Sequence, residues 1–229
     1  MYTQHNRYLG LLLAPLMLVA IQGCSSDDDG PVLLVDDNGY TSVNLSVMRS
    51  ELDSLPLGEL SDVEREGILY MREEEKLARD VYLYLDQVWN RRVFKNISDS
   101  EQTHADTMLL LIERYRLTDP VGNNPPGVFT NSILQNLHDD LIAQGDPSLI
   151  DAFKVGALIE EVDLVDIERY IANVSGNDDI VLVYENLMKG SRNHLRAFVR
   201  NLDSQGVTYI PEYLDPDDYD AIINSPMEH

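Results

Sequence analysis

Apolar residues recur every three or four positions through most of the chain after residue 60, and this period predicts amphipathic helices. Residues 61–64, SDVE, have the spacing of a capping box, so the first helix is expected to begin there and to run to about Trp89. Further helices are expected over about 92–117, 149–172 and 179–204. Residues 118–147 form a long connection that contains a short helical piece at 131–144, and no alternating strand pattern interrupts the helices.

The lengths of the connections favour one arrangement of these helices. Short turns are predicted between the first and second helices and between the third and fourth, with a long crossover between the second and third. That is the connectivity of ferritin-like folds rather than of simple up-and-down bundles. We therefore expect an all-α protein, with a ferritin-like four-helix bundle over residues 60–205 and a tail of residues 206–229 that packs on it.

The second helix has two polar side chains inside its apolar face. Its row of residues at helical spacing is Phe94, Ile97, Glu101, His104, Met108, Leu111 and Tyr115. Ser98 and Glu101 also have the spacing of a capping box, which is a purely structural alternative. Because Phe94 and Ile97 keep the same phase, the helix is expected to start before Ser98, and this places Glu101 in its interior.

The third and fourth helices show similar interruptions. Glu160 lies in the middle of an apolar row, and Asp163 follows one turn later near the same face. Glu161 is turned about 100° away and is expected to be solvated. On the fourth helix, His194 falls in another apolar row. A lone buried histidine is more often a hydrogen-bonded core residue than a metal ligand, so the argument depends on the whole group.

The first helix adds Glu74 and Glu75, each of which falls in an apolar row, so the period does not choose between them. An unpaired buried ion costs several kcal/mol, so these acids need a partner. Salt bridges are one explanation, and the candidate partners are Arg79, Arg192 and Arg196. A pair of divalent cations explains better why carboxylates and imidazoles occur together.

Several segments resemble known families. Residues 101–104, EQTH, resemble the Glu-x-x-His motif of ferritin-like di-iron carboxylate proteins, and "EKLARDVY" resembles the first-helix pattern of rubrerythrins, which favours Glu75. "MREEEKLARDVY", "SEQTHAD", "GALIEEVD", "YENLMKGSRNHLRAFV" and "QGVTYIPEYL" resemble the uncharacterised ferritin-like family called domain of unknown function 2202, over roughly residues 60–223. The rows and the resemblance together suggest the metal ligands Glu75, Glu101, His104, Glu160 and His194, with Asp163 and Glu74 as further candidates. They imply two iron ions, with manganese or a single ion left open.

The chain departs from the di-iron pattern at one position. Where a second Glu-x-x-His motif is expected on the fourth helix, Ser191 stands three residues before His194. Glu185 cannot replace the missing glutamate, because nine residues of helix place it on the opposite face. Asp163, or a water beside Ser191, is the expected substitute.

The start of the chain resembles a bacterial lipoprotein signal. Arg7 precedes an apolar run over residues 9–20, and Ile21-Gln22-Gly23 leads into Cys24. This resemblance implies a signal peptide over residues 1–23, lipid on Cys24 and an acidic tether over residues 24–59, so the protein is expected to be exported and held at the cell envelope by the lipid alone. An ordinary secretory signal is the alternative. Cys24 is the single cysteine, which excludes disulfides and cysteine metal sites from the rest of the chain.

The formal net charge of −23 argues against nucleic acid and anionic lipid as partners. The expected partners are metal ions, O2 or peroxide and, for redox turnover, an external electron donor; a homodimer is left open. Peroxide reduction or ferrous oxidation are the reactions that the resemblance implies, and whether the protein is an enzyme is left open. A non-catalytic metal-storage module and a metal-free acidic interaction lipoprotein are the alternatives.

Overall fold

The computed structural model describes residues 30–36, 38 and 40–229. Within these residues the regular elements are helices apart from two strands of three residues each, so the all-α prediction is confirmed. The elements are β1 (Leu33–Val35), β2 (Thr41–Val43), α1 (Leu45–Ser54), α2 (Asp62–Trp89), α3 (Arg92–Arg114), α4 (Ser132–Gly145), α5 (Leu149–Ile171), α6 (Asp178–Ser204) and α7 (Pro216–Ile223). The predicted signal peptide and Cys24 lie outside the described residues. Among the residues that the structure describes, no helix combines the length and apolar composition needed to cross a membrane.

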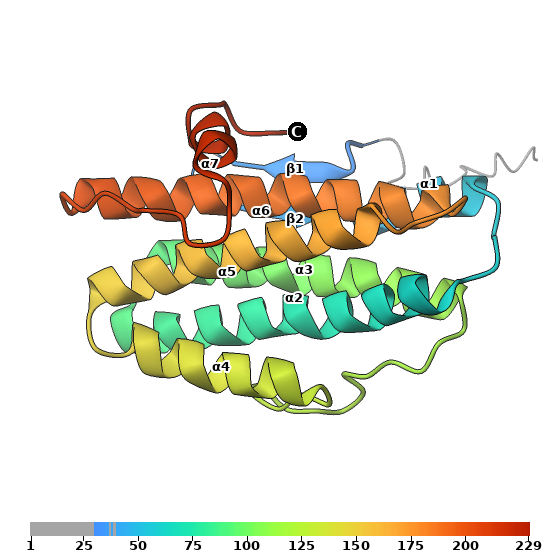
Figure 1. Cartoon of the computed structure of the whole chain (residues 1–229), viewed down its shortest axis with the longest axis horizontal. Coiled ribbons are helices and arrows are strands. Elements are labelled where there is room, and N and C mark those ends of the chain that lie inside the picture. The colour runs from blue at the N-terminus through green and yellow to red at the C-terminus, as the bar shows by residue number, and fades with distance from the viewer. Residues whose placement is uncertain (1–29, 37, 39) are drawn as a thin grey trace, which may run out of the picture.

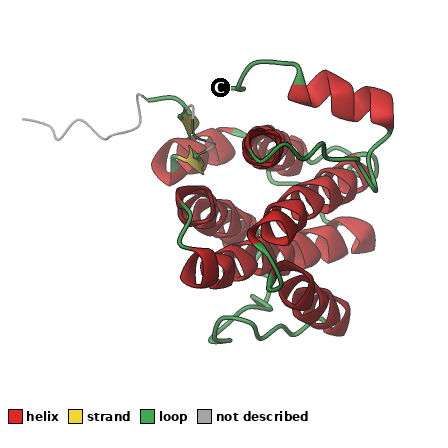
Figure 2. Cartoon of the chain, turned by 90° about the vertical axis from the view of Figure 1, so that its left-hand side faces the viewer, coloured by secondary structure: helices red, strands yellow, loops and turns green. Residues whose placement is uncertain are grey.

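The long helices α2, α3, α5 and α6 lie side by side, with α2 packed mainly against α3 and α5 against α6 (Figure 1, Figure 2). The turn from α2 to α3 is short because Asn90 adopts a left-handed conformation, with φ of 48°. From the end of α3 the chain crosses to α5 through a long loop and α4, which packs on α2 and α5. The short, long, short order of connections agrees with the sequence prediction.

The local signals at the helix starts are confirmed. Ser61 caps α2, because its hydroxyl accepts from the Glu64 amide while the Glu64 carboxylate accepts from the Ser61 amide at 2.8 Å. Helix α3 begins at Arg92, so Ser98 lies well inside it. The alternative in which Glu101 belongs to a capping box is therefore wrong.

The core of the long helices consists of two apolar clusters. One contains Tyr82, Phe94 and Phe198, and the other contains Met71 and Met108, all of them buried. On α2, α3 and α6 the polar residues predicted as ligands fall between these two clusters along the sequence, whereas Glu160 on α5 is flanked by Ile159 and Leu164 of the first cluster. The arrangement places a buried polar layer halfway along the helices, with apolar side chains above and below it.

Residues 30–59, which were expected to be part of a tether, contain ordered elements that the sequence pattern missed. Strands β1 and β2 pair in antiparallel register, with Leu33 opposite Val43, and β2 packs on α3 and α6. The amides of Thr41 and Val43 donate to the hydroxyls of Ser100 and Thr103 on α3. The described part of the expected tether thus contains a hairpin followed by the helix α1.

The C-terminal tail is held along α5 and α6 by polar contacts. Glu161, which was expected to be solvated, is fully buried: its carboxylate accepts from the Tyr209 hydroxyl and from the backbone amides of residues 212–214. That expectation was wrong because the tail covers this face of α5.

Both ends of the described chain meet at one residue of α6. Asn193 donates through Nδ2 to the Thr41 hydroxyl at 3.2 Å and to the backbone carbonyl of Glu228 at 2.9 Å. The Glu228 carboxylate accepts from Arg192 and Arg196. The hairpin and the tail therefore fasten α6 at the position next to His194.

Candidate metal centre

The polar layer centres on three residues. Glu101 and His104 lie one turn apart on α3, and His194 faces them from α6; each offers one ligand atom, and these atoms lie within 4.8 Å of one another. Glu101 is 2% exposed and both histidines are completely buried. A carboxylate and two imidazoles in such a small buried volume form a donor set that suits iron, manganese or zinc.

Glu101 lies between the two histidines. Its Oε2 is 2.8 Å from Nδ1 of His104, and its Oε1 is 2.9 Å from Nδ1 of His194. Each histidine also has a second carboxylate 3.4 Å from Nδ1, Oε2 of Glu75 for His104 and Oε2 of Glu160 for His194. The imidazole rings stack with centroids 5.3 Å apart. The centre therefore has two similar halves, one from each histidine and its own glutamate, which share Glu101.

The histidine nitrogens are close to oxygens without forming hydrogen bonds to them. Within the described residues, neither ring nitrogen of His104 or His194 has a hydrogen-bond partner of acceptable geometry. Ligand atoms about 2.0–2.2 Å from one ion are themselves about 3 Å apart, and their lone pairs point at the ion rather than at each other. Orphaned buried nitrogens that converge with carboxylate oxygens fit a cation site and are costly without one.

The carboxylates of the centre need positive charge to ionise together. Burial raises the pKa of Glu75 to about 8 although His104 opposes the shift, and burial with the negative charge of Glu101 raises that of Glu160 to about 7. Burial opposes the ionisation of Glu101, but the two histidines outweigh it and lower its pKa. Burial likewise opposes protonation of His194, while Glu101 and Glu160 raise its pKa to about 9. Without a metal, bound protons balance the negative charge of the carboxylates in this layer.

Two neighbouring residues fix the positions of the ligands. The Tyr82 hydroxyl donates to Oε1 of Glu160 at 2.6 Å, which leaves Oε2 directed at His194. Gly190 on α6 lies against His104, where a Cβ would be 2.4 Å from Cε1 and 2.5 Å from Nε2 of the ring. The role of Gly190 could not be predicted from the sequence, because a single glycine in a helical pattern gives no signal of what it faces.

The two further candidates lie beside the centre. The Ser191 hydroxyl donates to Oδ2 of Asp163, so the serine that stands where a glutamate was expected pairs with the aspartate named as its substitute. Oδ1 of Asp163 has no hydrogen-bond partner in the described part of the chain. The structure brings Glu75 rather than Glu74 to His104, and Glu74 lines a cavity of about 30 Å³ next to Leu77 and Leu141.

The three arginines considered as neutralising partners contact other groups. Arg79 pairs with Asp80 and donates to Gln102, while Arg192 and Arg196 both contact Glu228. The salt-bridge explanation of the buried acids therefore finds no support from these side chains.

Comparisons with known proteins find a family model and a relative with a solved structure. Residues 64–226 match the family model described as "Uncharacterized protein domain (DUF2202)". A relative from Methanocaldococcus jannaschii, "Uncharacterized protein MJ0754", is 51% identical over 181 residues, which cover 79% of this chain and 97% of the relative. The crystal structure of hypothetical protein MJ0754 superposes with a TM-score of 0.74 at 51% identity, over 76% of this chain and 99% of that one. None of these descriptions names a function.

Proposed function

The chain belongs to the DUF2202 family, and from that premise we propose that it is a metal-binding protein with a ferritin-like four-helix bundle over residues 60–205. The proposed ligands are Glu75, Glu101, His104, Glu160 and His194. The observation that carries the proposal is the pair of histidine Nδ1 atoms that are buried without hydrogen bonds beside three carboxylates.

Two ions account for the arrangement better than one. Each half of the centre has its own histidine and its own glutamate, and the two oxygens of Glu101 face different halves. A carboxylate that uses one oxygen for each ion is the usual bridge of a two-metal site. Carboxylate and imidazole donors suit iron best among the metals that the family resemblance implies, and manganese or a single ion is the alternative.

A bound iron pair supplies electron-transfer chemistry toward O2 or peroxide, and an external donor restores the electrons. The chain's own residues shape the place where this occurs. Tyr82 orients Glu160, and the apolar clusters on both sides of the polar layer exclude water. Ser191 stands where the di-iron pattern has a second glutamate, and Asp163 on α5 accepts a hydrogen bond from its hydroxyl.

The location is proposed from the sequence alone. The lipoprotein-like signal over residues 1–23 supports export and attachment through lipid on Cys24, with residues 24–59 linking the lipid to the helices. The mass of the mature N-terminal peptide tests this proposal. A diacylglycerol-modified Cys24 is expected, and an unmodified peptide that starts elsewhere contradicts it.

Metal analysis of the purified protein after iron loading tests the binding function. Wild type is expected to keep one or two ions per chain, and His194→Ala to lose them. His138→Ala is the matched control, because His138 contacts Asp139 and Phe129 away from the centre and should leave the metal content unchanged. A wild-type content under about 0.1 ion per chain at saturating iron rules out the proposal.

A non-catalytic storage module is the second candidate, and the net charge of −23, which attracts cations, favours it. Peroxide consumption by the iron-loaded protein with an excess of reductant separates the two functions. Steady turnover supports a redox enzyme, whereas one stoichiometric oxidation followed by no further reaction supports storage.

A further inference from the structure

A row of buried acids continues from the metal centre along the interface of α2 and α5. On α5, Glu160, Asp163 and Asp166 follow one another at intervals of three residues, so they share one face of the helix. Helix α2 packs against this face and contributes Glu75 and Glu74. Asp166 is the outermost member, with a side chain 13% exposed, whereas Glu160 belongs to the centre.

Glu74 is the member that most needs an explanation. It is 3% exposed, and neither carboxylate oxygen has a hydrogen-bond partner among the residues described here. Asp163 shares this situation in part: it is 5% exposed, its Oδ2 accepts from the Ser191 hydroxyl, and its Oδ1 is unpartnered in the described part of the chain. Buried acids without partners are unfavourable for folding, which points to a cation that visits them.

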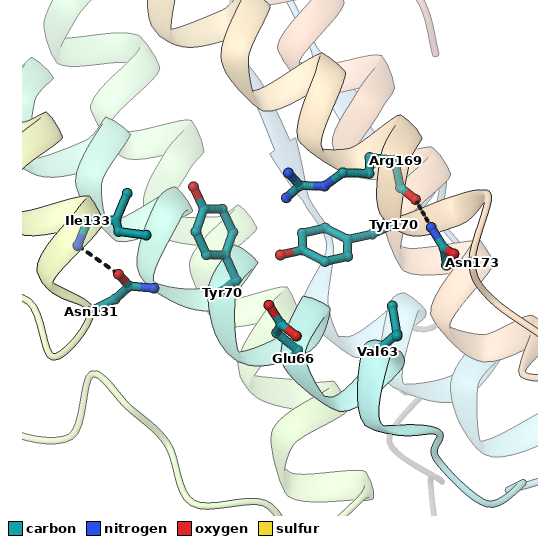
Figure 3. Close-up of a pocket in the computed structure, with 8 residues that line it drawn as sticks. All are labelled: Val63, Glu66, Tyr70, Asn131, Ile133, Arg169, Tyr170 and Asn173. Carbon is teal, nitrogen blue, oxygen red and sulfur yellow. Dashed lines mark hydrogen bonds between the residues drawn. The ribbon is translucent and has the colours of Figure 1, made fainter.

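The outer end of the row reaches a surface pocket of about 490 Å³. Figure 3 shows Tyr70 and Arg169 facing each other across this pocket, with the Tyr170 ring beside the guanidinium and Glu66 below. Arg169 pairs with Asp166 at 3.1 Å and lies over the Tyr170 ring at 4.6 Å. Burial and the negative charges of Glu74 and Asp166 raise the pKa of Tyr70, which also lines the pocket. The wall of the pocket and the acid row are therefore in contact.

We propose that Asp166, Glu74 and Asp163 form an access route along which divalent cations pass from the surface pocket to the metal centre. This inference rests on the proposed function, because it assigns a path to the ions that the centre binds. Carboxylate oxygens replace part of the hydration shell of a hard divalent cation, and successive acids about one helical turn apart allow it to move from one to the next. Arg169 stands at the outer end, where its positive charge opposes the arrival of a cation.

The rate at which the apo protein takes up Co²⁺ tests the route. Absorbance in a stopped-flow instrument follows the change in cobalt coordination, and the end point gives the number of ions bound per chain. Glu74→Gln and Asp166→Asn keep the side-chain size and remove one negative charge each. Glu168→Gln is the matched control, since this residue is on the same helix but exposed. Arg169→Gln removes the opposing charge.

We expect Glu74→Gln and Asp166→Asn to slow uptake about tenfold or more without changing the final number of ions, because charges along a path change association rates by one to three orders of magnitude. Arg169→Gln should accelerate uptake, and Glu168→Gln should match wild type. Equal rates for all variants overturn the route while leaving the metal centre intact. A lower final content in Glu74→Gln also overturns it, because Glu74 is then a ligand. Wild type that binds no Co²⁺, Fe²⁺ or Mn²⁺ removes the proposed function itself.

Discussion

Gly190→Ala offers a direct test of the metal centre, because the change adds one methyl group against a single proposed ligand. The new Cβ would lie 2.4 Å from Cε1 and 2.5 Å from Nε2 of His104. Carbon atoms in contact are about 3.5–4.0 Å apart, so the imidazole must move by roughly 1 Å. Metal–ligand distances are satisfied only within about 0.2 Å, and a displacement of this size removes His104 from the ligand set.

The effect on stability should be much smaller than the effect on metal binding. Overpacking a helix interface costs about 1–3 kcal/mol, and replacing a helical glycine by alanine returns about 1 kcal/mol through helix propensity. We expect the free energy of unfolding of the apo variant to fall by about 2 kcal/mol at most. Its affinity for Co²⁺ or Fe²⁺ should fall at least 10–100-fold, the loss that follows even when only an outer partner of a ligand is removed.

Gly67→Ala is the matched control for this experiment. Its new Cβ would be 2.7 Å from Cδ1 of Tyr170 and 3.0 Å from the Tyr184 hydroxyl, so it overpacks another helix interface without touching a proposed ligand. Calorimetric titration of both apo variants measures affinity, and urea unfolding measures stability. Wild-type affinity in Gly190→Ala, at an unchanged number of ions, would show that the position of His104 does not determine binding.

Three further predictions concern single acids. Glu101→Gln should weaken metal binding more than about 100-fold, because Glu101 contacts both histidines. Iron content after dialysis measures this loss, and a variant that retains two ions contradicts the proposal that both halves of the centre share Glu101. Glu161→Ala should release the tail and lower the free energy of unfolding by about 3 kcal/mol, because the Tyr209 hydroxyl and three backbone amides lose their acceptor. Limited proteolysis measures the release, and unchanged resistance of residues 206–229 contradicts this prediction. Burial opposes ionisation of Glu64, but hydrogen bonds from Ser61, Ser175 and Asn177 outweigh it and lower its pKa to about 2. Because the folded pKa lies below the unfolded value, ionised Glu64 contributes about 3 kcal/mol above about pH 4.5, and this is lost as the pH falls toward 2. Glu64→Gln should therefore be less stable at pH 7 and show a flatter stability profile below pH 5 in urea unfolding, and a profile parallel to wild type would refute the assignment.

The helices could be predicted from the sequence because their signals are local. The capping box at Ser61 and the apolar period fixed the starts of α2 and α3 to within a residue, and the ends followed within about three. The two short strands were missed because three residues are too few to show an alternation. Their stability comes from the hydroxyls of Ser100 and Thr103, which lie about 60 residues away in the chain.

The proposed ligands could be found because acids and histidines interrupt apolar rows, but the period left two choices open. Glu74 and Glu75 are neighbours about 100° apart, and both directions point into packed interfaces, so only the fold shows which one faces His104. Glu161 was predicted to be solvated from its angle alone. The position of a residue around the helix axis gives the direction of its side chain but not what covers it. The residues that cover Glu161 belong to the tail, about 50 residues later in the chain.

Asn193 donates hydrogen bonds to Thr41 and Glu228, and these two residues are synthesised at very different times. Glu228 leaves the ribosome after every proposed ligand, whereas Thr41, the other partner of Asn193, leaves before any of them. A nascent chain therefore contains all five proposed ligands before Glu228 can contact α6, the helix that carries His194. A product truncated before Glu228 therefore keeps the proposed ligands but lacks the contacts of Glu228 with Arg192, Asn193 and Arg196.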